Sequence, residues 1–112
     1  MLYLLNTFSP MMMAEGTGIK TLVKEISIYE AMENLEKGFT SGISHEITAK
    51  IISVLLMENI SFDRKNIVLN RNDKAICIVP NFRADVAREF TWLEVTGAGY
   101  RCFKVDIVEI IK

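Results

Sequence analysis

The segment from His45 to Glu58 constrains the fold more than any other part of the chain, because its apolar residues recur at the spacing of one helix face. Ile47, Ile51 and Leu55 mark that face, and Ser44 is a good N-cap directly before it. A helix with one apolar side has to bury that side against another element. The pattern therefore predicts a helix packed on a layer of other structure.

Strand-like apolar runs supply that layer. Five segments have this character: residues 2–5, 21–28, 67–69, 75–79 and 102–111. The first run is apolar throughout, as in a strand that is buried on both faces. The segments 67–69 and 75–79 are expected to pair as a hairpin, with the turn over residues 70–74.

The remaining parts of the chain are connections and one further helix. Ser27 and Glu30 have the spacing of a capping box, so a helix is predicted to begin there, and Gly38 is a suitable end. Residues 40–44 are expected to form a polar loop. Residues 83–93 can be interpreted as a helix or as an irregular turn.

Length and charge limit the number of domains and the kinds of partner. The 112 residues are enough for one domain. We therefore expect a single α/β domain over residues 1–112, with a mixed sheet of about five strands flanked by helices. The 13 Lys and Arg against 14 Asp and Glu give a net charge of −1, whereas salt-driven binders of nucleic acid usually have a basic excess. DNA is not an expected partner.

Few side chains are available for metal or cofactor chemistry. Cys77 and Cys102 are 25 residues apart and His45 is the one histidine, which is too few ligands for a zinc site. The cysteines are interpreted as buried thiols in a reducing compartment, with a disulfide as the alternative. The chain has no GxxxxGKS/T phosphate loop and no GxSxG elbow. We expect neither a metal nor another cofactor.

The N-terminal segment has no basic region, and its apolar run is too short for a signal peptide or a membrane span. The chain is therefore expected to be cytoplasmic, without a membrane partner.

His45 is the residue best placed for catalysis. It lies at the start of the predicted helix, where unpaired N–H groups and the helix dipole favour an anion. An imidazole beside a bound phosphate can donate a proton to a leaving oxygen near neutral pH. Thr48, one turn further along, could add a hydroxyl to the same site. The alternative is that His45 and Thr48 are ordinary surface residues of the helix.

Four other residues are candidates for binding an anion. Arg83 follows the strand predicted at 75–79, and its guanidinium could hold a phosphate in a bidentate manner. Ser9 follows the first predicted strand, at the end where α/β sheets gather ligands. Arg64 and Lys65 form a small basic spot before the predicted hairpin. Each of these can equally be a solvated side chain.

These segments together resemble a known family. Leu4-Leu5-Asn6-Thr7-Phe8-Ser9, Ile43-Ser44-His45-Glu46-Ile47-Thr48 and Arg83 after an apolar strand are similar to motifs of the viral ring nucleases. That family comprises small type III anti-CRISPR proteins of archaeal viruses, phages and some prophages. Its members cleave cyclic tetra-adenylate, the second messenger of type III CRISPR defence. The resemblance spans nearly the whole chain and rests on short motifs and their order.

The resemblance implies roles for individual residues. It makes His45 the catalytic residue and Arg83 the ligand-binding arginine that stabilises the transition state, so both are assigned to catalysis. It places Ser9 and Thr48 near the bound ring.

This sequence also departs from the family pattern. Ser44 stands where the family usually has glycine, and it is counted among the ligand-binding residues. Val86 stands where a glutamate is expected, so Asp85 or Glu89 could substitute, and Asp85 is assigned to ligand binding. Arg64 and Lys65 could replace a basic residue expected at Asn66.

The implied reaction needs no metal, because RNA supplies its own nucleophile, the 2′-hydroxyl. Its products would be linear dinucleotides with 2′,3′-cyclic phosphate ends. The family is dimeric, and a two-fold axis suits a ring of four identical nucleotides. The resemblance thus implies a homodimer that suppresses immunity in the host cytoplasm. A protein that only sequesters the ring, or a structural module without a ligand, are the alternatives.

Overall fold

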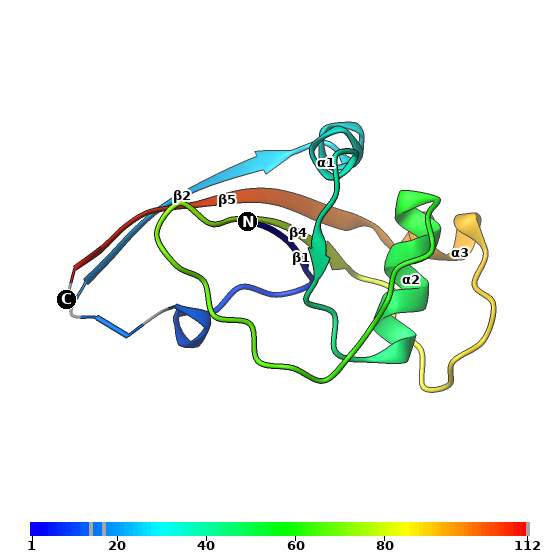
Figure 1. Ribbon diagram of the computed structural model, residues 1–112. Coiled ribbons are helices and arrows are strands. Elements are labelled where there is room, and N and C mark those ends of the chain that lie inside the picture. Colours follow the sequence, from blue (N-terminus) through cyan, green and yellow to red (C-terminus); the bar gives the residue numbers. More distant parts are fainter. Residues whose placement is uncertain (14, 17, 112) are drawn as a thin grey trace.

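The computed structural model describes residues 1–13, 15–16 and 18–111. Within them lie a sheet and helices that Figure 1 shows in sequence colours. In chain order the elements are β1 (Leu2–Leu5), a 3-10 turn (Pro10–Met12), β2 (Gly18–Ile26), α1 (Ile28–Leu35), β3 (Thr40–Ser41), α2 (Glu46–Leu56), β4 (Lys74–Pro80), α3 (Trp92–Ala98) and β5 (Tyr100–Ile111).

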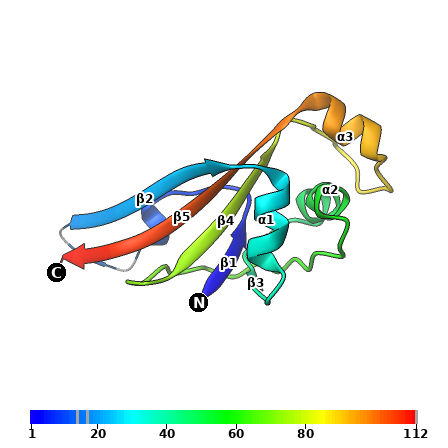
Figure 2. The same cartoon turned by 90° about the horizontal axis from the view of Figure 1, so that it is seen from above.

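The strands form one mixed five-stranded sheet with the order β2-β5-β4-β1-β3, which can be followed in Figure 2. β1 lies parallel to both β4 and β3. β5 lies antiparallel to β4 and to β2. The predicted α/β class, with about five strands in a mixed sheet, is confirmed. Because β1 and β4 are parallel and adjacent, their carboxyl ends meet at the same edge of the sheet.

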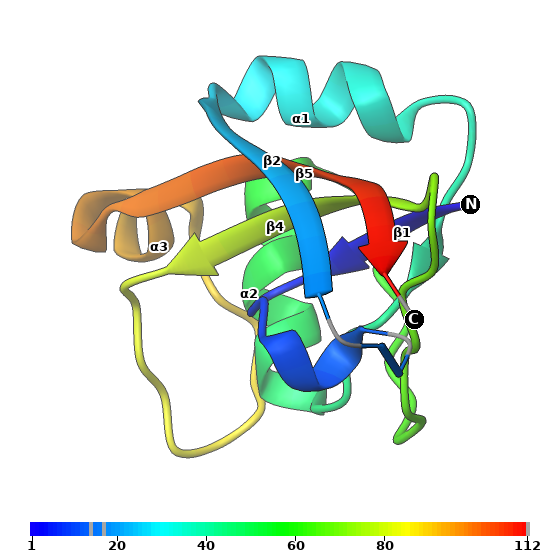
Figure 3. The same cartoon turned by 90° about the vertical axis from the view of Figure 1, so that its left-hand side faces the viewer.

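The sheet is covered on both faces. On one face, α1 and α2 enclose the main core, in which Leu4, Ile52 and Ile76 are completely buried. On the other face, a smaller core contains Leu5 and Leu69 and lies against the 3-10 turn. Figure 3 shows α1 and the 3-10 turn on opposite sides of the sheet. In the described part of the chain, no helix is long and apolar enough to cross a membrane.

The hairpin predicted from residues 67–69 and 75–79 is wrong. β4 already pairs with β1 on one side and with β5 on the other, so no free edge remains for the segment before it. Leu69 instead forms an isolated parallel bridge with Met13 and is completely buried in the smaller core.

The fifth strand lies elsewhere, because Thr40–Ser41, predicted to be loop, pairs with β1 as β3. Gly42 allows this close approach: a Cβ atom there would lie 2.5 Å from Leu5 Cδ2. The Gly42 N–H instead donates to the Leu4 carbonyl at 2.8 Å.

Helix ends differ in detail from the sequence prediction. The N-cap of α2 is His45 and not Ser44, since the first helical N–H, that of Ala49, donates to the His45 carbonyl at 3.0 Å. α1 begins as predicted, with the Ser27 hydroxyl accepting a hydrogen bond from the Glu30 N–H. Residues 81–90 are irregular, and α3 begins only after Thr91.

The two cysteines are free and buried. Cys77 faces the smaller core and Cys102 faces the helices, so the sheet separates their thiols. The predicted thiol form is thus observed. Burial raises the pKa of both thiols to about 11, from an ordinary value of 9.0.

Thiol labelling tests this burial. In the native protein at neutral pH, we expect a disulfide-exchange reagent to label both cysteines roughly 10²-fold more slowly than in denaturant, because the thiolate is scarce and covered. The labelling rate is followed by absorbance. Rapid labelling of either cysteine without denaturant would contradict the structure.

Candidate functional site

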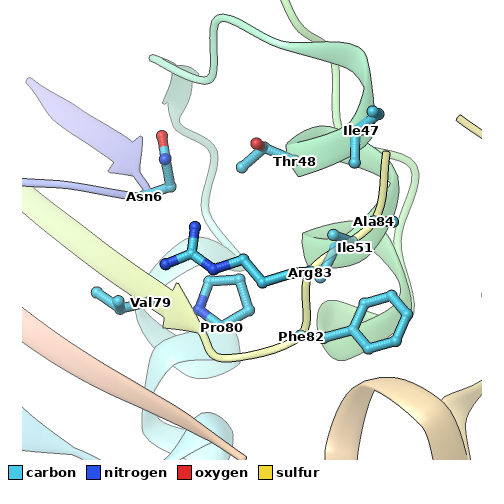
Figure 4. A pocket seen from close by; sticks show the side chains of 9 residues that line it. All are labelled: Asn6, Ile47, Thr48, Ile51, Val79, Pro80, Phe82, Arg83 and Ala84. Carbon is cyan, nitrogen blue, oxygen red and sulfur yellow. The ribbon is translucent and has the colours of Figure 1, made fainter. Parts of the chain in front are cut away.

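The candidate site lies where the carboxyl ends of β1 and β4 meet the start of α2. Open α/β sheets bind ligands at this end of parallel strands. A cavity of about 250 Å³ occupies the place. Figure 4 shows its lining residues: Asn6, Ile47, Thr48, Ile51, Val79, Pro80, Phe82, Arg83 and Ala84. We call this the arginine cavity.

Arg83 is the charged residue of the arginine cavity. It leaves the loop after β4, and its guanidinium lies between the ends of β1 and β4, across from Thr48 (Figure 4). Among the residues that the structure describes, Arg83 has no hydrogen-bond or ion-pair partner, and its side chain is exposed. Its donors are free to bind an external anion.

A second hollow, of about 620 Å³, adjoins the arginine cavity and shares Ile47, Thr48 and Ala84 with it. We call it the histidine hollow, because His45 lines one side of it. Asp85 lines it from the loop that carries Arg83. Between them, the two spaces are lined by four of the residues predicted from sequence: His45, Thr48, Arg83 and Asp85.

The start of α2, which lines the histidine hollow, has free hydrogen-bond donors. The His45 side chain makes no capping hydrogen bond. Within the described residues, the N–H groups of Glu46, Ile47 and Thr48 likewise have no acceptor. These three N–H groups and the positive end of the helix dipole favour a bound anion. An anion held there would lie beside the exposed imidazole of His45.

Four predicted ligand-binding residues do not line these two spaces. The Ser9 hydroxyl accepts a hydrogen bond from the Met11 N–H at 3.2 Å and so caps the 3-10 turn. Ser44 precedes the N-cap of α2 and is half-buried. Arg64 and Lys65 are exposed on the irregular segment between α2 and β4. None of the four is among the lining residues of either space.

Asn6 also lines the arginine cavity, although it is not among the site residues predicted from the sequence. It directly follows β1, and its side chain amide faces the arginine cavity (Figure 4). An amide both donates and accepts hydrogen bonds, so it can bind the edge of a base or a hydroxyl. Its position in the sequence could have identified it as a site residue. A polar residue that directly follows a buried strand lies at the edge of the sheet where ligands bind.

The loop of residues 81–91 carries Arg83 and Asp85 over the start of α2. The Asn81 N–H donates to the Gly99 carbonyl at 2.9 Å at the beginning of the loop. At its end, Thr91 and Glu94 form a complete capping box at the start of α3. Both ends of the loop are therefore anchored to the segment around α3.

Glu94 gives this anchor a measurable dependence on pH. The Arg88 guanidinium and then the Thr91 N–H lower the pKa of Glu94 from 4.5 to about 2. A carboxyl whose pKa is lower in the folded protein stabilises the fold above the pKa of the unfolded chain. The stabilisation from Glu94 is thus complete above pH 4.5 and is lost as the pH falls towards about 2.

We expect Glu94→Gln to lower the melting temperature at pH 7, and the difference from wild type to shrink as the pH falls from 4.5 to about 2. Thermal unfolding followed by circular dichroism over this range measures the difference. Glu33→Gln is the matched control, because the Glu33 side chain is exposed and has no partner among the described residues. A pH-independent difference for Glu94→Gln would contradict the assignment.

An apolar surface borders the arginine cavity on the other face of the sheet. A hollow there is lined mainly by Phe8, Val23, Val79 and Phe103, and it shares Asn6 and Val79 with the arginine cavity. Val23 is 52% exposed and Val79 is 38% exposed. The candidate site and this exposed apolar surface therefore share residues at the carboxyl ends of β1 and β4.

Three comparisons relate the chain to known proteins. A family model described as STIV B116-like matches residues 2–101. "Uncharacterized protein 26" of Sulfolobus islandicus filamentous virus (isolate Iceland/Hveragerdi) is 31% identical over 110 residues, which cover 96% of this chain and 92% of the viral protein. The solved structure of B116 of Sulfolobus turreted icosahedral virus has a TM-score of 0.79 and 18% identity, over 94% of this chain and 97% of B116. At that identity, the structural match shows a shared fold.

Proposed function

Because the chain belongs to the STIV B116-like family, which has members in viruses of Sulfolobus, we propose that this viral protein is a metal-independent ring nuclease. Its substrate is cyclic tetra-adenylate, and its action removes the second messenger of type III CRISPR defence in the host cytoplasm. The proposal joins the resemblance of the sequence motifs to the geometry of the site.

One observation carries the proposal: the unpaired Arg83 lines the arginine cavity, His45 and the residues with free N–H groups at the start of α2 line the histidine hollow, and the two spaces share three lining residues. Arg83 comes from a loop after β4, whereas His45 comes from the start of α2. The chain thus brings a proton donor and anion-binding groups together from segments that are 38 positions apart in the sequence. An anionic phosphodiester with an adjacent leaving oxygen is the ligand that uses all of these groups.

The proposed reaction is an attack by the ring's own 2′-hydroxyl. The 2′-oxygen loses its proton to solvent and bonds to the adjacent phosphorus, while the bond from phosphorus to the 5′-oxygen breaks. His45 donates a proton to the departing 5′-oxygen, and Arg83 binds the non-bridging oxygens. Positioning of the 2′-hydroxyl can contribute about 7–11 kcal/mol, and a general acid contributes about 10²–10⁴-fold. The product ends in a 2′,3′-cyclic phosphate.

We propose that the active form is a homodimer. The hollow on the exposed apolar surface around Val23, Val79 and Phe103 shares two lining residues with the arginine cavity, so a second copy seated there would bring a second candidate site close to the first. Two sites related by a two-fold axis match the symmetry of a ring of four identical nucleotides. Cleavage at two opposite phosphodiesters gives two dinucleotides. The dimer also doubles the cations around an anionic ring, which accommodates the net charge of −1.

A thermal-shift titration with cyclic tetra-adenylate tests the proposal, with the fate of the ring read by mass spectrometry. We expect the ring to raise the melting temperature, because a ligand that binds only the folded state stabilises it. We also expect the ring to be converted to dinucleotides. Stabilisation with an intact ring would favour a sequestering protein. No stabilisation and an intact ring would favour a structural module.

A further inference from the structure

The loop that carries Arg83 has no regular hydrogen-bonded structure of its own. Among the described residues, no backbone-to-backbone hydrogen bond involves residues 82–90. The place of Arg83 therefore depends on side chains that hold the loop. The Phe82 and Phe90 rings meet edge to face with centroids 5.4 Å apart, and they close the loop at its base. Phe82 is the immediate neighbour of Arg83.

Arg88 fastens this closed loop to α3. Its guanidinium donates two hydrogen bonds to the two carboxylate oxygens of Glu94, one of them at 3.2 Å. It also donates to the Glu89 carbonyl at 2.9 Å. The guanidinium carbon lies 4.6 Å from the centroid of the Phe90 ring. One side chain thus contacts the loop backbone, the Phe90 ring and Glu94 of α3.

Glu94 is itself fixed by the start of α3. Its carboxylate accepts hydrogen bonds from the Thr91 N–H at 2.7 Å and from the Thr91 hydroxyl at 3.0 Å. A carboxylate with four donors is a rigid acceptor, and a bidentate guanidinium pair has a defined geometry. The contacts form a continuous path from Glu94 through Arg88, Phe90 and Phe82 to Arg83.

Arg88 and Arg83 have different electrostatic states. The charge of Arg88 is neutralised by Glu94, and the pair holds the pKa of Arg88 above its ordinary value. Arg83 has no such carboxylate among the described residues. Arg83, which faces the site, has no carboxylate partner among the described residues, whereas Arg88, near the other end of the loop, is paired with Glu94. This division suits one residue for ligand binding and the other for holding the loop.

We infer that Arg88 is a positioning residue for Arg83: by binding Glu94 and covering Phe90, it sets the shape of loop 82–90. Its effect on the loop stands on the geometry alone, whereas its effect on the ring rests on the proposed function. Lys50 forms a weaker ion pair with the loop: its Nζ lies 3.4 Å from Oε1 of Glu89, whose side chain is 98% exposed. Exposed pairs of that kind contribute little.

Backbone nitrogen relaxation tests the effect on the loop without any ligand. In Arg88→Ala, we expect order parameters of residues 83–87 to fall from values near a rigid backbone's ~0.85 to below ~0.6, while those of α2 stay unchanged. Arg88→Lys, which keeps the charge but not the bidentate pair, should be intermediate. Arg71→Ala is the matched control, because it removes an exposed arginine from the turn before β4. Unchanged order parameters in Arg88→Ala would overturn the inference.

A double-mutant cycle tests the effect on the site. In a His45→Ala background that keeps the ring intact, Arg88→Ala should weaken binding of cyclic tetra-adenylate by roughly tenfold, since a displaced binding group loses its contact. In a chain that already carries Arg83→Ala, Arg88→Ala should add no further weakening. If Arg88→Ala weakened ring binding by the same factor in chains with Arg83 and in chains with Arg83→Ala, the inference would be overturned. If the protein with Arg83 and Arg88 intact does not bind the ring, the proposed function fails, and the relaxation data alone decide the role of Arg88.

Discussion

Replacing His45 by alanine is expected to slow ring cleavage at least about 10²-fold while leaving binding of the ring intact. The lost group is a general acid, and 10²-fold is the lower end of what such a group contributes. His45 is exposed and makes no capping hydrogen bond, so its removal leaves the structure of α2 unchanged. Single-turnover cleavage and a binding titration on the same preparation separate the two effects.

A second variant separates proton donation from simple contact. His45→Gln keeps a side chain that can donate a hydrogen bond but cannot donate a proton near neutral pH. It should therefore cleave as slowly as His45→Ala. Cleavage at the wild-type rate by either variant would remove His45 from the mechanism.

Replacing Arg83 by alanine is expected to weaken both binding and cleavage. A hydrogen bond to a charged group contributes about 1.5–3 kcal/mol, which corresponds to roughly 10–10²-fold in the dissociation constant. Arg83 has no hydrogen-bond partner among the described residues, so its removal leaves no other protein group unpaired. The measured loss of affinity therefore reports the contact between Arg83 and the ring. Isothermal titration with the ring measures the binding term, and single-turnover kinetics measure the rate.

The control for Arg83 is Arg71→Ala. It makes the same change in net charge in the turn before β4, at the opposite end of that strand from Arg83. If the effect were only one of overall charge, both variants would bind the ring equally weakly. An unchanged dissociation constant in Arg83→Ala would show that this residue is not the phosphate clamp.

The elements that the sequence predicted well are those with a strong local signal. The 3.6-residue spacing in α2, the apolar run of β1 and the capping-box spacing at Ser27 are all present in the structure. Each of these patterns depends on neighbours within a few residues, so it can be recognised without knowing the tertiary contacts.

The errors lie where pairing between distant segments decides the structure. β3 has only two residues, and it is a strand because it lies beside β1. The segment 67–69 looks like a strand, but both edges of β4 are already occupied. His45 has the extended backbone of an N-cap, so α2 begins one residue later than predicted, and spacing rules do not fix helix ends to within one residue.

In the site, too, some residues could be predicted from local sequence, whereas others depend on contacts between distant segments. His45, Thr48, Arg83 and Asp85 come together because they follow element ends that the sheet topology gathers at one edge. Ser9 also follows β1, but the 3-10 turn uses its hydroxyl as a cap. The positioning contacts of Arg88 depend on a loop without periodicity, so the sequence alone gave no indication of them.

The most direct test of the central claim is a single-turnover incubation with cyclic tetra-adenylate in EDTA, with the products resolved by chromatography and mass. We expect linear dinucleotides that end in 2′,3′-cyclic phosphate, because the ring's own hydroxyl is the nucleophile and His45 the acid. Products with a simple phosphate end and no cyclic precursor, or a ring that stays intact in EDTA, would contradict a metal-independent ring nuclease.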